Sequence, residues 1–221
     1  LDVQPFSVSV PEVTLTDLRE RLARTRWPDE VDGAGWAYGT NLAFMRDLVG
    51  YWRAGFDWRA RERAINAFDH YRAAIDGVGI HFVHARGRGP DPVPLLITHG
   101  WPSSFYEMLP LVPLLSDPAA HGSDPADSFD VVVPSVPGYA FSDRPTRPGF
   151  DYRRVADLWA RLMAGLGYGR FGAHAYDIGA SIMAHLLFDR PELLIGYHTT
   201  DPGNPVPFVG PGSPPLTEGE R

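Results

Sequence analysis

The 221-residue chain contains no cysteine, which excludes disulfides, thiol catalysis and cysteine-ligated metals. It has no uninterrupted apolar run of about 18 residues, and residues 1–10 lack the basic and apolar regions of a signal peptide. No stretch is rich in basic residues and the net charge is −7, so neither nucleic acid nor a membrane is expected as a partner. These absences favour a soluble globular protein, for which we expect a cytoplasmic location.

The most informative segment is residues 171–180, which reads as a buried strand that turns sharply into a helix with Asp177 at the corner. Such a corner is typical of a nucleophile elbow, and Ala175 and Gly179 provide the small flanking residues that it needs. A carboxylate at this place favours attack on an sp³ carbon, because water can later cleave the resulting ester. An Asp that opens a helix can also be a simple N-cap.

A second motif follows another apolar run. Residues 94–98 are typical of a buried parallel strand, and His99–Pro102 form the turn after it. Proteins with a nucleophile elbow carry a second oxyanion donor in the turn after such a strand. We therefore expect the backbone N–H groups of Trp101 and Ile178 to form an oxyanion hole for a carboxylate oxygen of Asp177.

Strand and helix patterns alternate from about residue 91 onward, which predicts an α/β fold with a mostly parallel sheet and helices on both faces. Residues 129–134 read as a buried strand, and residues 135–142 as the loop at its carboxyl end. Ligands bind at such ends in open α/β sheets. Tyr139 and Phe141 are therefore candidate substrate-binding residues.

Several helices are expected outside these strands. Residues 151–167 predict an amphipathic helix with an Asp cap and a Gly stop. Nearer the N-terminus, residues 14–17 resemble a capping box. Residues 42–56 carry apolar side chains at helical spacing, and their aromatic stripe is interpreted as core. The chain thus divides into an N-terminal segment with a helical meander, residues 1–90, and an α/β part, residues 91–221.

These motifs resemble those of an epoxide hydrolase of the α/β-hydrolase superfamily, in the microsomal-like branch with an extra N-terminal segment. The matching segments follow the family's order over almost the whole chain: Arg26–Pro28, Trp36, Tyr38–Gly39, Tyr51–Trp52, Phe56–Arg59, Ile75–Gly77, Ile80–His84, His99–Pro102, Pro137–Tyr139, Phe141–Ser142 and the Asp177 elbow. The resemblance implies hydrolysis of a small or medium apolar epoxide in two steps, in which Asp177 first opens the ring to form an ester. It also implies two cap tyrosines that protonate the leaving oxygen, and a His, paired with an acid, that activates water. No cofactor or metal is implied.

In this family the cap, the acid and the His follow the nucleophile. His198 lies in an apolar run that predicts the next strand, and residues 211–221 read as a connection into the cap. We therefore expect the first half of an enzyme, inactive alone, whose remaining machinery lies beyond residue 221. The alternatives are a haloalkane-type dehalogenase, which shares the Asp elbow, and a catalytically inactive fragment. The oligomeric state is open, with a homodimer among the options.

The other polar residues that invite a functional role have structural interpretations. His81 and His84 point to opposite faces of a predicted strand, so they cannot bind one metal ion. His174 faces away from the attack path, and His99 is interpreted as a residue that stabilises its turn. Ser181 lies within the helix after the elbow, which makes it a poor nucleophile.

Overall fold

The computed structural model describes residues 1–200. Their contacts form two compact units: residues 7–67, and residues 1–6 together with the residues from 68 onward. By their contacts, the strands just before residue 90 belong to the larger unit. The domain boundary expected at residue 90 stays a prediction. Residues 211–221, expected to lead into a cap, lie outside the described residues.

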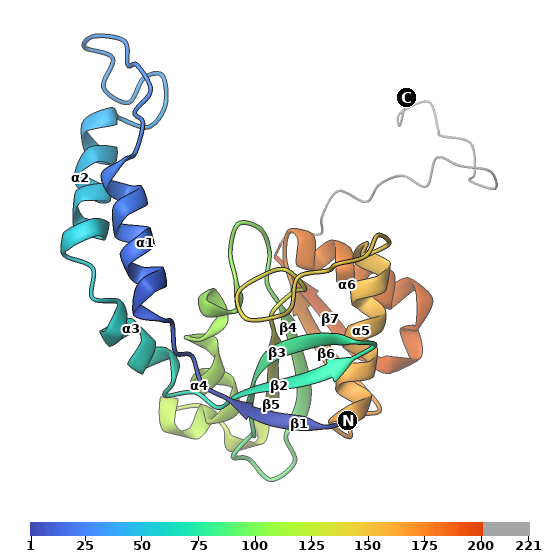
Figure 1. Ribbon diagram of the computed structural model, residues 1–221. Coiled ribbons are helices and arrows are strands. Elements are labelled where there is room, and N and C mark those ends of the chain that lie inside the picture. Colours follow the sequence, from blue (N-terminus) through green and yellow to red (C-terminus); the bar gives the residue numbers. More distant parts are fainter. Residues whose placement is uncertain (201–221) are drawn as a thin grey trace, which may run out of the picture. The chain divides into compact units, whose positions relative to one another are not determined.

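The larger unit is built on a sheet in which the described strands follow the order β1-β2-β3-β5-β4-β6-β7 (Figure 1). The strands are β1 (Val3–Phe6), β2 (His70–Ile75), β3 (Val78–Ala85), β4 (Val93–Thr98), β5 (Phe129–Pro134), β6 (Phe171–Ala175) and β7 (Leu194–Thr199). β1, β2, β3 and β5 pair in antiparallel fashion, whereas β5, β4, β6 and β7 pair in parallel. The sheet is therefore mixed, with its parallel part where the strand-helix alternation predicted it.

Helices pack on both faces of this sheet (Figure 1). They are α4 (Leu111–Ser116), α5 (Tyr152–Gly165) and α6 (Ile178–Asp189), with the 3₁₀ helices η1 (Phe105–Met108), η2 (Pro118–His121), η3 (Pro125–Asp127) and η4 (Pro191–Leu193). Successive strand residues point to opposite faces. Leu96 accordingly packs into the core cluster with α5 and α6, while the equally buried Ile97 belongs to the opposite face. The predicted α/β class is confirmed.

Helix α5 follows the sequence prediction closely. The Asp151 side chain accepts a hydrogen bond from the Arg154 N–H at 2.8 Å, which makes it a true N-cap. Leu158, Trp159 and Leu162 are fully buried against the sheet. Each such side chain contributes about 1.5–3 kcal/mol through burial. This packing fixes α5 beside α6, the helix whose N-cap residue is Asp177.

The smaller unit consists of α1 (Glu12–Ala23), α2 (Leu42–Ala54) and α3 (Trp58–Ile65). The capping-box prediction at residues 14–17 is wrong, because α1 begins earlier, after Pro11, and has no side-chain cap. The core assignment of the aromatic stripe is also wrong for α2, in which no residue is buried.

The apolar side chains of α1 and α2 instead line an open groove of about 450 Å³. Its residues are Leu15, Leu18, Arg19, Leu48, Tyr51, Trp52, Phe56 and Trp58. Within residues 1–200, no helix is long and apolar enough to cross a bilayer.

Candidate active site

Asp177 stands at the corner between β6 and α6 in a backbone conformation that residues other than glycine rarely adopt, with φ 52° and ψ −129°. A Cβ atom on Gly179 would lie 2.6 Å from the carbonyl oxygen of Thr98 and 2.7 Å from that of His99. Only glycine fits there, because the elbow presses against the end of β4. The strained strand-to-helix corner predicted from the sequence is therefore present.

The Asp177 side chain occupies the N-cap position of α6 but makes no capping hydrogen bond. Asp151 and Asn41, the N-caps of α5 and α2, both accept one from a backbone N–H of their helix. The Asp177 carboxylate turns instead towards the turn that follows β4, where its Oδ1 accepts a hydrogen bond from the Trp101 N–H at 2.6 Å. The reading of Asp177 as a simple N-cap therefore does not fit the structure.

The turn that carries Trp101 approaches the Asp177 side chain very closely. A Cβ atom on Gly100 would lie 2.7 Å from the Asp177 Cβ and 2.9 Å from its Oδ1. A side chain at Gly100 would push the N–H of Trp101 away from the carboxylate. The glycine of the His-Gly-Trp-Pro motif is thus required by space.

His99 holds the same turn from within the protein. Its ring is fully buried, and its Nε2 accepts the Val136 N–H at 3.1 Å, so Nδ1 carries the proton and donates to the Gly100 carbonyl at 3.0 Å. Burial lowers the pKa of His99, which keeps the ring neutral as this pair of bonds requires. The interpretation of His99 as a turn-stabilising residue is confirmed.

A cavity of about 340 Å³ opens beside the carboxylate. It is lined by Trp101, Val136, Pro137, Tyr139, Pro145, Phe150, Asp151, Tyr152, Val155, Asp177 and Ile178. The predicted residues Trp101, Tyr139, Asp177 and Ile178 are therefore brought together. Burial first, then the nearby Tyr152 and Asp177, raises the pKa of the Tyr139 phenol, which stays protonated at neutral pH.

Phe150 and Tyr152 are cavity residues that the sequence reasoning missed. They lie where the chain enters α5 after the loop that leaves β5. The sequence pattern predicts substrate contacts only in residues 135–142 of that loop. Continuing the same rule to the start of the next helix would have included both residues.

Phe141 lies elsewhere. Its ring packs against Phe6, His81 and Phe105, with ring centroids 5.3–5.9 Å apart. It is not among the residues that line the cavity. The loop turns between Tyr139 and Phe141 at Ala140, whose φ is 44°, so the two aromatic side chains diverge. Phe141 thus anchors the loop and does not contact the cavity.

The histidines have structural surroundings. His81 bonds to Ser135 and His70, whereas His84 bonds to Tyr168. His174 and His198 lie on neighbouring strands with their Nδ1 atoms 2.9 Å apart. Among residues 1–200, no histidine lines the Asp177 cavity. In the part of the chain that the structure describes, Asp177 therefore lies in a cavity that no histidine lines.

A polar cluster beside the elbow was not predicted. The Tyr176 hydroxyl donates to Glu107 Oε2 at 2.6 Å, and the Ser103 hydroxyl donates to the same oxygen. These bonds, Ser103 first, lower the pKa of Glu107. Burial first, then Glu107, raises the pKa of Tyr176. A Tyr directly before the nucleophile was visible in the sequence, but its partner lies far away along the chain.

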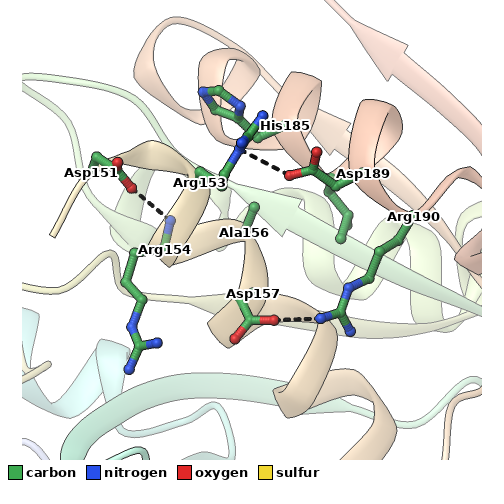
Figure 2. A pocket seen from close by; sticks show the side chains of 9 residues that line it. Asp151, Arg153, Arg154, Ala156, Asp157, His185, Asp189 and Arg190 are labelled. Atoms are coloured by element: carbon green, nitrogen blue, oxygen red, sulfur yellow. Dashed lines mark hydrogen bonds and ion pairs between the residues drawn. The ribbon is translucent and has the colours of Figure 1, made fainter. Parts of the chain in front are cut away.

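A second cavity, of about 400 Å³, lies between α5 and α6 (Figure 2). Ion pairs cross it from one helix to the other: Arg153 to Asp189 at 3.0 Å and Arg190 to Asp157 at 2.6 Å. Its charged groups therefore neutralise one another and hold the two helices together. It lacks an elbow and an oxyanion donor, so the first cavity is the better candidate site.

Comparisons with known proteins show which families the chain resembles. Residues 93–215 match the family model of the alpha/beta hydrolase fold, and residues 3–108 match that of the epoxide hydrolase N terminus. A provisionally named epoxide hydrolase of Stigmatella aurantiaca is 44% identical over 98% of this chain and 48% of that protein. Epoxide hydrolase 1 of Oryctolagus cuniculus is 34% identical over 89% of this chain and 44% of that protein.

Solved structures of epoxide hydrolases also resemble this chain. The juvenile hormone epoxide hydrolase of Bombyx mori has a TM-score of 0.81 at 30% identity, over 90% of this chain and 53% of that one. The Aspergillus niger epoxide hydrolase has a TM-score of 0.79 at 29% identity, over 90% and 52% of the two chains.

The chain therefore belongs to the α/β-hydrolase fold family. Within it, residues 3–108 match the epoxide hydrolase N-terminus model, and the relatives and solved structures above are named epoxide hydrolases. The chain spans about half the length of the curated relatives it matches.

Proposed function

We propose that the chain supplies the nucleophilic half of an enzyme that hydrolyses a small or medium apolar epoxide to a vicinal diol. The observation that carries this proposal is the hydrogen bonding of the Asp177 carboxylate. It makes no capping bond to its own helix and accepts the Trp101 N–H at the wall of a cavity. Val136, Phe150 and Val155 give that cavity an apolar wall suited to an uncharged substrate.

In the first step, Asp177 Oδ2 forms a bond to an epoxide carbon while the carbon–oxygen bond of the ring breaks. The released alkoxide takes a proton from an acid, leaving a hydroxyalkyl ester. In the second step, water attacks the ester carbonyl carbon and displaces the diol. The oxygen that becomes negative is Oδ1, which already accepts the Trp101 N–H, and the Ile178 N–H is the proposed second donor.

The test begins with full-length protein in ¹⁸O-labelled water, under single turnover. Water attacks the Asp177 carbonyl, so the label should enter the protein and the first diol should carry none. A fully labelled first diol would mean direct attack of water on the epoxide and would overturn the nucleophile assignment. Bromoalkane is the matched alternative substrate, and halide release with no diol from epoxides would indicate a dehalogenase.

The 221-residue chain gives a second measurement. We expect it to take up styrene oxide as a single covalent adduct on Asp177 without sustained diol production, because residues 1–200 hold no base at the cavity. General-base loss alone costs about 10²–10⁴ in rate. Intact-mass spectrometry and peptide mapping locate the adduct, with Asp177→Asn as the control. Sustained turnover that depends on Asp177 would refute the expected inactivity of the chain alone.

A further inference from the structure

Glu107 joins the two segments that form the oxyanion site. Ser103 lies two residues after Trp101, and Tyr176 lies one residue before Asp177. Both hydroxyls donate to one atom, Glu107 Oε2. A single carboxylate oxygen therefore spans the gap between the turn and the elbow.

The backbone of Glu107 is well fixed. It belongs to η1, whose Phe105 and Met108 side chains are 2% and 5% exposed, and Ser104 caps this helix by accepting the Tyr106 N–H. The remaining freedom of Glu107 lies in its side chain. Two donors on one oxygen remove that freedom, and bonds to a charged acceptor are stronger than neutral ones.

The Tyr176 ring transmits this constraint to the reacting atoms. A Cβ atom on Gly100 would lie 2.9 Å from Tyr176 Cε2, so the ring lies directly against the Gly100 backbone. Gly100 precedes Trp101, whose N–H reaches the carboxylate at 2.6 Å. Movement of the ring would therefore move the oxyanion donor relative to the nucleophile.

We propose that Glu107 is a positioning residue, which holds the turn that carries Trp101 against the elbow that carries Asp177. Neither Glu107 nor Tyr176 lines the cavity, so they act through the donor and not on the substrate. The inference rests on the proposed function and adds to it. The step that needs the donor most is ester hydrolysis, because negative charge then develops on Oδ1.

The experiment uses the 221-residue chain with styrene oxide as the probe. After the Asp177 ester has formed, the excess reagent is removed and the decay of the adduct mass is followed at pH 9, where hydroxide replaces a protein base. Tyr176→Phe and Glu107→Ala should each slow the decay by about tenfold, because a misplaced group weakens catalysis strongly. Ester formation should change by less than about twofold, since it needs no oxyanion donor.

Three controls separate positioning from general damage. Glu107→Gln keeps an oxygen acceptor and should recover most of the rate lost in Glu107→Ala. The double variant Tyr176→Phe/Glu107→Ala should decay no more slowly than either single variant, because both changes remove the same bond. Glu192→Ala, an exposed carboxylate change in η4, should leave both rates unaltered.

The two proposals fail in different ways. Unchanged decay in folded Tyr176→Phe and Glu107→Ala chains, with an adduct that still requires Asp177, overturns the positioning role alone. An adduct that persists in Asp177→Asn, or a fully ¹⁸O-labelled first diol from the full-length protein, overturns the proposed function and the positioning role together. Circular dichroism and melting curves establish that each variant is folded.

Discussion

At the scale of single residues, the site combines strain with close approach. Asp177 has a positive φ, and both Gly100 and Gly179 lie where a Cβ atom would collide with the neighbouring segment. A non-glycine residue in such a conformation costs of order 1–3 kcal/mol, which the rest of the fold must offset. Asp177, the proposed nucleophile, is thus held in place at the expense of stability.

Asp177→Gly should therefore stabilise the fold by about 1 kcal/mol, once the greater freedom of glycine in the unfolded chain is subtracted. Asp177→Ala is the matched control, because it removes the carboxylate but keeps a Cβ atom in the strained conformation. Urea unfolding of the three chains measures the difference. A Gly variant less stable than the Ala variant by about 0.5–1 kcal/mol, the ordinary cost of glycine, would show that the backbone at residue 177 is not strained.

The buried His81 predicts a pH effect. Burial first, then His70 and Arg72, lowers its pKa from 6.5 to about 3. Between pH 3 and pH 6.5 His81 is protonated in the unfolded chain and neutral in the folded chain. The contribution of neutral His81 to the free energy of unfolding is therefore complete above pH 6.5 and is lost on acidification. The slope is at most about 1.4 kcal/mol per pH unit.

Urea unfolding between pH 7 and pH 4 tests this effect. His81→Gln should flatten the dependence of the unfolding free energy on pH, even though it lowers stability at pH 7 by disturbing the bond to Ser135. His121→Gln, at an exposed position, should keep the wild-type slope. An unchanged slope in His81→Gln would mean that His81 does not contribute to acid sensitivity.

At the scale of elements, two helices have an Asp at the N-cap position, and the two side chains bond differently. Asp151 caps α5, whereas Asp177 opens α6 with its side chain directed at Trp101. Helix α6 therefore starts uncapped by a side chain, which leaves the carboxylate free for chemistry.

Asp151→Ala should accordingly destabilise the fold by about 1 kcal/mol, because one N–H of the first turn of α5 loses its acceptor. Asp177→Ala should show no such capping loss, since no capping bond exists there. Thermal unfolding of the two variants gives the comparison. A larger loss for Asp177→Ala than for Asp151→Ala would contradict the difference between the two helix starts.

At the scale of the whole molecule, the parallel part of the sheet ends at β7 in the described residues. Ile195 on this strand is 54% exposed. An exposed apolar side chain on the last described strand of the sheet favours association with another chain.

Ile195→Lys should therefore reduce self-association of the 221-residue chain, measured by light scattering during size-exclusion chromatography. A charge on an edge strand disfavours pairing with a second edge. Val13→Lys, which replaces another exposed apolar residue on α1, is the control and should have little effect. Equal effects of the two variants would indicate that general charge, and not the β7 edge, governs association.

Local features of the site could be predicted from the sequence because they are encoded by neighbouring residues. The apolar run before Asp177, the small Gly179 after it and the strand at residues 129–134 depend on periodicity and local sterics, and the structure has all three. The same local rules failed where packing decided. Residues 14–17 fit a capping box, yet the helix starts earlier after Pro11.

The sequence by itself determined the α/β class and the corner at which Asp177 stands, since both follow from patterns a few residues long. Tertiary structure decided which distant groups meet there. It turned Phe141 away from Tyr139 and brought Glu107 to the hydroxyl of Tyr176. Loop direction and side-chain contacts between segments far apart in the chain depend on how the sheet and helices pack, and no local pattern records that.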